Sequence, residues 1–198
     1  RTSLKAVVKT LLAEVEGSEL AQLKADVDRM STELDQAGLE RRLLSHLHEA
    51  LAAAEPAPGQ ARVLAGPAGL AVLLLDPHVR GYLLRPDSLM PRLAASLLTD
   101  RREGEPDRPL TFTTDDLPLD ILDVKKASDV AQKRLMLIKS RTELQDAAVA
   151  MLNDQLPVAV TNAANIGTGR LQNAMLDIRR EFARQGKEII LLIEDFAL

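Results

Sequence analysis

Hydrophobic residues recur at helical spacing along the first fifty residues of the chain. In the opening stretch they fall at i, i+3, i+4, i+7, i+8 and i+11, on one face of a helix: Leu4, Val7, Val8, Leu11, Leu12 and Val15. Gly17 suits the end of this helix, and Ser18 suits the cap of the next one. A third helix is predicted from Leu39, Leu43, Leu44, Leu47 and Leu51. Residues 1–54 are therefore expected to form a set of N-terminal helices.

The middle segment, residues 55–123, begins with a break in this pattern. Two prolines and a glycine interrupt it in EPAPGQ, residues 55–60. The run 70–75 is compatible with a buried strand or with a buried helix. Pro67 suits the first turn of a helix, so a helix is favoured.

Two short helices and a long loop are expected next. Asp76 and Pro77 fit the N-cap and the first position of one helix, and another helix begins near Ser88. Residues 100–123 are polar, proline-rich and charged, which indicates a long exposed loop with a short extended piece at 110–113. Loops of this length in compact domains are often functional or mobile.

The last segment, residues 124–198, is predicted to contain long helices that lead to a final strand. The pattern is mostly helical from 125 to about 162, with Pro157 as an expected kink or break. The stretch NAANIGTGR, residues 162–170, indicates a turn-rich connection. A further amphipathic helix is marked by Leu171, Met175, Ile178 and Phe182.

Two acidic residues follow directly on the last apolar run. Residues 189–193 are all isoleucine or leucine, which is typical of a buried parallel strand, and Gly186 is expected to end the helix before it. Glu194 and Asp195 come next, and functional groups of open α/β sheets lie just past the carboxyl ends of strands. In the Walker B arrangement of P-loop nucleotidases, such acids hold Mg²⁺ and orient a water. Two ordinary acids at a solvated strand end explain the same pattern.

Other candidate sites are weaker. The phosphate-binding motif G-x-x-x-x-G-K-[ST] is not found. The glycines of 167–170 are compatible with an anion site at a helix N-terminus, but an ordinary turn is favoured. His46 and His48 are two residues apart on a predicted helix, so they point to different sides. Asp115 and Asp116 are compatible with a metal site, but a turn cap at Thr114 or Asp115 is favoured.

The composition narrows the choice of function. Aromatic residues make up 2% of the chain and hydrophobic residues 46%, so the core must be aliphatic. The net charge of -4 argues against a dedicated nucleic-acid-binding module, although it allows a local basic patch. In the 100–123 loop, acidic neighbours oppose a phosphate contact by Arg101 and Arg102. The basic doublets are typical of solvated faces: Arg41-Arg42, Arg101-Arg102, Lys125-Lys126 and Arg179-Arg180.

The absence of certain sequence features excludes further classes. The chain has no cysteine, which excludes disulfides, zinc–thiolate sites and cysteine nucleophiles. No apolar run approaches the roughly 20 residues of a membrane span, and the start has no signal-peptide pattern. The chain is therefore expected to be cytoplasmic. It begins without Met and stops just after a predicted strand, so it is also expected to be a fragment of a longer protein.

Three stretches carry a resemblance to a known family: RTSLKAVVKTLL at 1–12, LLLDPHVRGYLLRPDSLMPRL with LTFTTDDLP in the middle, and RLQNAMLDIRREFARQGKEIILLIEDFAL at 170–198. Together they resemble a large bacterial P-loop ATPase family associated with DNA-modification and phage-defence gene clusters. The resemblance implies a P-loop upstream of residue 1, a helical region, and a Walker B strand at LLIEDFAL. It carries over Glu194 and Asp195 as catalytic and Mg²⁺-binding residues.

The resemblance also implies cofactors and partners. The parent ATPase would bind ATP and Mg²⁺, whereas this chain without a P-loop would not bind them tightly. Its partners would be the rest of the ATPase and other subunits of a DNA-modification or defence complex, with DNA contacted through that complex. The order is Glu then Asp, where Asp then Glu is common, so it stays open which acid serves the metal and which the water.

The predicted fold is thus mainly α, a bundle-like helical region with one or a few β-strands, belonging to a larger α/β P-loop fold. One domain is expected. The alternative function is a non-enzymatic helical protein–protein interaction module, because long amphipathic helices are present and no P-loop is found.

Overall fold

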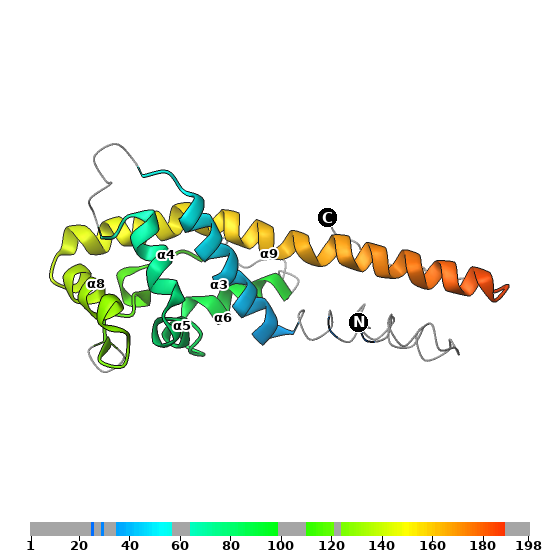
Figure 1. Ribbon diagram of the computed structural model, residues 1–198, viewed down its shortest axis with the longest axis horizontal. Coiled ribbons are helices and arrows are strands. Elements are labelled where there is room, and N and C mark those ends of the chain that lie inside the picture. The colour runs from blue at the N-terminus through cyan, green and yellow to red at the C-terminus, as the bar shows by residue number, and fades with distance from the viewer. Residues whose placement is uncertain are drawn as a thin grey trace, which may run out of the picture. The chain divides into compact units, whose positions relative to one another are not determined.

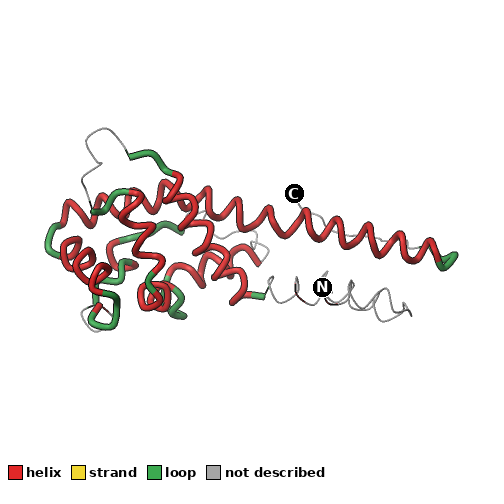
Figure 2. The backbone as a smooth tube through the Cα atoms, in the orientation of Figure 1, coloured by secondary structure: helices red, strands yellow, loops and turns green. Residues whose placement is uncertain are grey.

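The computed structural model describes residues 25, 29, 35–56, 64–98, 110–120 and 124–188. The elements in this part are α3 (Gln36–Ala53), α4 (Pro67–Leu75), α5 (Pro77–Leu83), α6 (Leu89–Leu98), the 3-10 helix η1 (Thr114–Asp116), α8 (Asp129–Lys139) and α9 (Thr142–Arg184). The prediction of a mainly helical fold is confirmed, and Figure 2 shows no strand among the described residues. The predicted strand at 189–193 and most of residues 1–34 lie outside them.

The chain divides into two compact units. One unit is Asp35–Asn165, and the other combines Arg1–Leu34 with Ile166–Leu198. This division follows contacts rather than chain order, and α9 contributes to both units. The three segments predicted from the sequence, 1–54, 55–123 and 124–198, stay a prediction.

Helix α3 forms for the reason that its apolar spacing indicated. Asp35 caps it, and its carboxylate accepts a hydrogen bond of 2.7 Å from the Gly38 N–H. The inward face buries all five leucines of the predicted pattern, together with one alanine: Leu39, Leu43, Leu44, Leu47, Ala50 and Leu51. This face contacts α4 and α6.

The apolar run at 70–75 is helical, as Pro67 suggested. Gly66 is the N-cap of α4 and Pro67 occupies its first turn, where its missing N–H costs no helical bond. Asp76 then separates α4 from α5, and Pro77 begins α5. The predicted cap and first position of this helix are confirmed. Helix α6 begins at Leu89, next to the predicted Ser88.

The core of the Asp35–Asn165 unit is aliphatic and is completed by α9. Figure 1 shows α3 running across the first half of α9, with α4, α5, α6 and α8 on the same side of it. Residues of α9 at spacings of three and four enter the core: Ala148, Leu152, Leu156, Ala159 and Ala163. The Arg42 guanidinium of α3 donates a 2.9 Å hydrogen bond to the Ala163 carbonyl. Small residues on α9 allow this close approach.

The predicted turn at 162–170 is wrong, and Pro157, where a kink or break was predicted, does not break the helix. Helix α9 runs through them for 43 residues. Pro157 deletes one backbone N–H and Gly167 and Gly169 each cost about 1 kcal/mol relative to alanine. These local costs do not end the helix, because it is already nucleated on both sides. Buried residues on either side of Pro157, Leu156 and Ala159, add packing energy.

Part of the predicted exposed loop packs on the core instead. Phe112 and Leu117 are 2% and 6% exposed and belong to the hydrophobic core. Residues 110–113, where a short extended piece was predicted, form no strand, and the backbone of Thr113 is extended, with φ -122° and ψ 173°. The remaining loop residues, 99–109 and 121–123, lie outside the described part.

Candidate functional site

The two acids singled out from the sequence, Glu194 and Asp195, lie outside the described residues. The description ends at Glu188, one residue before the apolar run that precedes them. The nearest described structure is the end of α9.

Helix α9 ends in a complete Schellman motif. Gly186 has φ 68°, in the left-handed region. Its N–H donates to the Ala183 carbonyl at 3.1 Å, and the Lys187 N–H donates to the Phe182 carbonyl at 2.9 Å. The prediction that Gly186 ends the helix is confirmed. An alanine there would meet no atom within 4 Å, so its cost would be conformational, about 1–2 kcal/mol.

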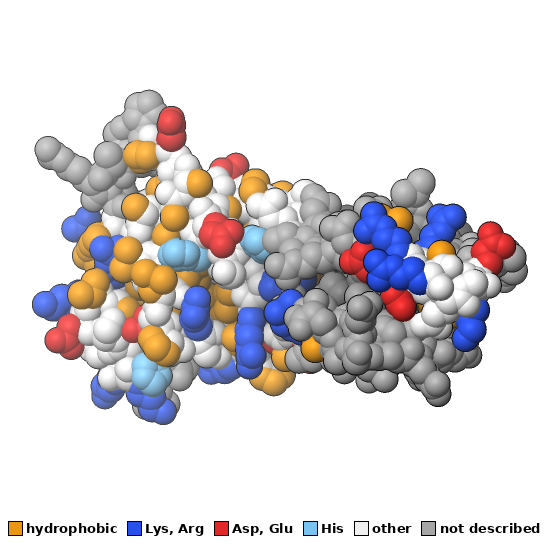
Figure 3. Space-filling view, turned by 45° about the vertical axis from the view of Figure 1, so that its right-hand side comes forward, with side chains coloured by type: hydrophobic (Ala, Val, Ile, Leu, Met, Phe, Trp, Pro, Cys, Tyr) orange, Lys and Arg blue, Asp and Glu red, His pale blue; other side chains and the backbone are white. Residues whose placement is uncertain are grey.

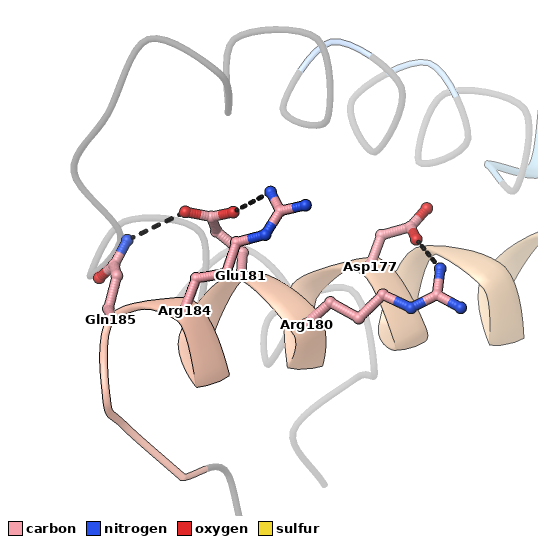
Figure 4. A network of polar contacts seen from close by, with 5 residues as sticks. All are labelled: Asp177, Arg180, Glu181, Arg184 and Gln185. Carbon is pink, nitrogen blue, oxygen red and sulfur yellow. Dashed lines mark hydrogen bonds and ion pairs between the residues drawn. The ribbon is translucent and has the colours of Figure 1, made fainter.

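The last turns of α9 carry a row of local polar contacts, shown in Figure 4. Arg180 pairs with Asp177 at 3.1 Å and Arg184 with Glu181 at 3.2 Å. The Gln185 amide donates to the other Glu181 oxygen at 3.4 Å. Each contact joins residues three or four apart and is solvent-exposed, so each stabilises the helix end by about 0.2–0.5 kcal/mol.

The opposite face of this helix end is apolar. Ile178 is 1% exposed and Phe182 is 6% exposed. The amphipathic pattern predicted here is confirmed at these two positions. Because Phe182 also accepts the bond from Lys187, the buried face and the helix end are fixed by the same residue.

The weaker candidate sites do not form metal or anion sites in the described part. His46 Nδ1 lies 3.0 Å from Glu49 Oε2 on the same helix, a local pair. No group of three or more histidines, cysteines or acids that would hold a metal occurs among the described residues. The anion turn at 167–170 is excluded because these residues are helical.

The acidic pair in FTTDDLP is part of a turn, with a different cap from the predicted one. Asp116 accepts hydrogen bonds of 2.8 Å from both the backbone N–H and the hydroxyl of Thr113. Thr113 is the N-cap of η1, so the expected cap at Thr114 or Asp115 is wrong by one or two residues. Asp116 is thus committed to the turn.

Asp76 has the N-cap role that the sequence predicted and also makes a long-range contact that the sequence did not predict. One of its oxygens accepts from the N–H groups of His78 and Val79, at 2.9 and 3.2 Å, as an N-cap does. Its other oxygen accepts from the Ser128 N–H at 2.8 Å, which is 52 residues away. Burial raises the pKa of this carboxyl, but the hydrogen bonds from Ser128, Val79 and His78 lower it more, so the pKa is lowered from 3.8.

An apolar cavity of about 30 Å³ lies inside the same unit. Its walls come from α4, α5, α8, α9 and the 110–119 segment, and they include Leu74, Val79, Phe112, Leu135 and Leu152. The lining is almost entirely carbon, so a water there would find no polar partners. The sequence pattern contains no signal for this cavity.

Comparisons with protein-family models, curated proteins and solved structures gave no match for this chain. In the described part, no helix has both the length and the apolar character that crossing a bilayer requires.

Proposed function

We propose that this chain is the helical region and Walker B strand of a P-loop ATPase of a bacterial DNA-modification or phage-defence system. The observation that carries the proposal is the order of features at the C-terminal end. A Schellman helix end at Gly186 is followed by Lys187 and Glu188, then by five aliphatic residues, and then by Glu194 and Asp195. A helix ended by glycine and followed by a short connection is a common entry into a parallel strand.

In the proposed ATPase, the two ends of this chain adjoin the two nucleotide-binding motifs. A P-loop upstream of residue 1 and a Walker B strand at the other end must lie close together to share one nucleotide. The Asp35–Asn165 unit would then be a helical insertion between them.

The proposed roles follow from the chemistry of carboxylates. One of Glu194 and Asp195 would hold Mg²⁺ through water, and the other would orient the water that attacks the terminal phosphate. ATP and Mg²⁺ would bind to the whole cytoplasmic ATPase. Phosphoryl transfer depends on positioning, so residues 1–198 without a P-loop are expected to bind ATP weakly, which calorimetry measures.

The test is made in the full-length protein. Glu194→Gln and Asp195→Asn keep side-chain size but remove charge, so ATP turnover should fall by about 10²- to 10⁴-fold while nucleotide binding survives. Glu188→Gln is the matched control, because Glu188 is exposed and precedes the apolar run. Unchanged turnover in both site variants would refute the proposal.

The second candidate is a helical interaction module without chemistry. It is favoured by apolar side chains exposed on one face of α4, where Val72 is 40% and Leu75 57% exposed. Figure 3 shows hydrophobic side chains gathered on the surface of the helical unit. Loss of the fold on deletion of residues 188–198, with no effect of the two acid substitutions, would favour this candidate.

A further inference from the structure

Basic residues are concentrated on and beside α8. The segment 125–141 contains six basic residues and one acidic residue, Asp129, within a chain of net charge -4. Five of the basic side chains are exposed, and together they are called the α8 basic face: Lys125, Lys126, Lys133, Lys139 and Arg141. The sixth, Arg134, is partly buried and donates to the Gly69 carbonyl at 2.9 Å.

The α8 basic face is directed outward by the packing of the helix. Helix α8 buries Ala131, Leu135 and Ile138 in the core. Lys133 lies on the side of the helix opposite to these residues, and Lys139 lies at the edge of the buried side, at the end of the helix. The ion pairs His46–Glu49, Arg180–Asp177 and Arg184–Glu181 of the described residues include none of the five cations. Their positive charge is therefore not neutralised by a partner within the described part of the chain.

Hydrogen bonds hold both ends of this face in place. The Gln132 amide donates to the carbonyls of Ala127 at 2.6 Å and Lys125 at 3.3 Å, which fixes the turn that carries the first two lysines. At the other end, Gln145 of α9 donates to the Lys139 carbonyl at 3.0 Å. Side-chain hydrogen bonds thus hold the backbone at both ends of the face, so binding would mainly order side chains.

We propose that the α8 basic face binds the phosphate backbone of double-stranded nucleic acid, without reading its sequence. Charge complementarity supports a polyanion, and lysine is a point-charge ligand for phosphate. The helix is about 16 Å long, which matches about five phosphates along one strand. No aromatic residue lies in 125–141, so stacking on single-stranded bases has no platform here.

A membrane surface fits this face less well. An interfacial helix buries a broad apolar face in the lipid, whereas the apolar face of α8 is already used in the core. The exposed apolar side chains of α8 are Val130 and Met136, which lie among the lysines. They are compatible with contact to a sugar–phosphate backbone, but too few to anchor a helix in a bilayer.

The test uses fluorescence anisotropy of two unrelated 20-base-pair DNA duplexes with the 198-residue chain and no nucleotide, between 50 and 200 mM KCl. The two duplexes should bind equally, with a slope of log K against log salt of about -4 to -5, because about five phosphates are neutralised. Replacing Lys125, Lys126 and Lys133 with glutamine should reduce this slope by about 3 and weaken binding at least 10-fold. Glutamine keeps helix propensity, so the fold should survive.

The control removes three exposed cations elsewhere in the same unit: Arg41→Gln, Arg80→Gln and Arg92→Gln. It should weaken binding less than 3-fold. Equal losses in both triple variants, or no binding at 50 mM salt, would overturn the proposal. Binding to phosphatidylserine vesicles or polyglutamate that exceeds DNA binding and is lost in the lysine variant would overturn it in favour of a membrane or an acidic protein. Because no ATP is used, failure here is separate from failure of the ATPase proposal.

Discussion

At the scale of single residues, two helical glycines stand in opposite environments. A Cβ on Gly69 would lie 2.3 Å from the Leu64 carbonyl oxygen, whereas a Cβ on Gly81 would meet nothing within 4 Å. Gly69→Ala should therefore lower the free energy of unfolding by about 1–3 kcal/mol through overpacking. Gly81→Ala should raise it by about 0.5–1 kcal/mol, because alanine loses less backbone entropy on folding. Urea unfolding of the two variants measures both effects. A Gly69→Ala protein as stable as the wild type would contradict the close approach of the Leu64 carbonyl to α4.

Asp76 provides a second prediction at this scale. In Asp76→Asn the amide oxygen still accepts from His78 and Val79, but an NH₂ group faces the Ser128 N–H. The resulting unpaired donors should cost about 1–3 kcal/mol at neutral pH. Asp35→Asn is the control, since Asp35 makes one cap bond to Gly38 and asparagine caps equally well. Denaturant unfolding at pH 7 compares the two variants.

The pH dependence of this effect follows from the lowered pKa of Asp76. A carboxyl whose folded pKa lies below its unfolded value stabilises the fold at pH values above the unfolded value. Its contribution is lost as the pH falls through the folded value. The difference between the wild type and Asp76→Asn should thus be constant above about pH 5 and shrink below 3.8. A difference that grows on acidification would show that the charged form is not the stabilising one.

At the scale of elements, one side chain holds the 110–113 segment against α9. The Asn153 amide oxygen accepts from the Phe112 N–H at 2.6 Å, and its NH₂ group donates to the Phe112 carbonyl at 2.9 Å. The Asn153 side chain thus bonds both backbone groups of Phe112, as a neighbouring strand would in a sheet. Because Pro157 has no N–H, the Asn153 carbonyl also lacks its backbone hydrogen bond within the helix.

Asn153→Ala should leave both backbone groups of Phe112 without this partner. We expect a loss of about 1–3 kcal/mol and faster amide hydrogen exchange at Phe112, while α3 keeps its protection. Asp154→Ala, on the exposed side of the same helix, is the control and should change neither. Unchanged amide exchange at Phe112 in Asn153→Ala would contradict the proposal that Asn153 holds the 110–113 segment against α9.

At the scale of the whole molecule, the apolar cavity marks the point where five parts of the Asp35–Asn165 unit meet. Val79→Ile adds one methylene at its wall and should raise the free energy of unfolding by up to about 0.8 kcal/mol. Val72→Ile makes the same change at a position that is 40% exposed and should have little effect. Thermal and urea unfolding measure both. A destabilised Val79→Ile protein would mean that the cavity walls cannot admit the methylene.

The sequence by itself determined the local features of this protein. Helices α3, α4, α5 and α6, the N-cap Asp76 with Pro77 in the first helical position, and the helix end at Gly186 all follow from patterns and residues within one or two turns. The energies involved, a cap bond or a left-handed glycine, depend on immediate neighbours. The acids Glu194 and Asp195 rest on such a local pattern as well.

Only the tertiary structure decided which local signals prevail. The glycines at 167 and 169 predicted an interruption that α9 does not have. The polar composition of residues 100–123 predicted an exposed loop, but Phe112 in this stretch is buried in the core. Packing also determines which basic residues are exposed. Arg42 and Arg134 donate hydrogen bonds to carbonyls 121 and 65 residues away, whereas the lysines on and beside α8 are exposed. These outcomes depend on contacts between residues far apart in the chain, whose energies exceed local propensities of about 1 kcal/mol.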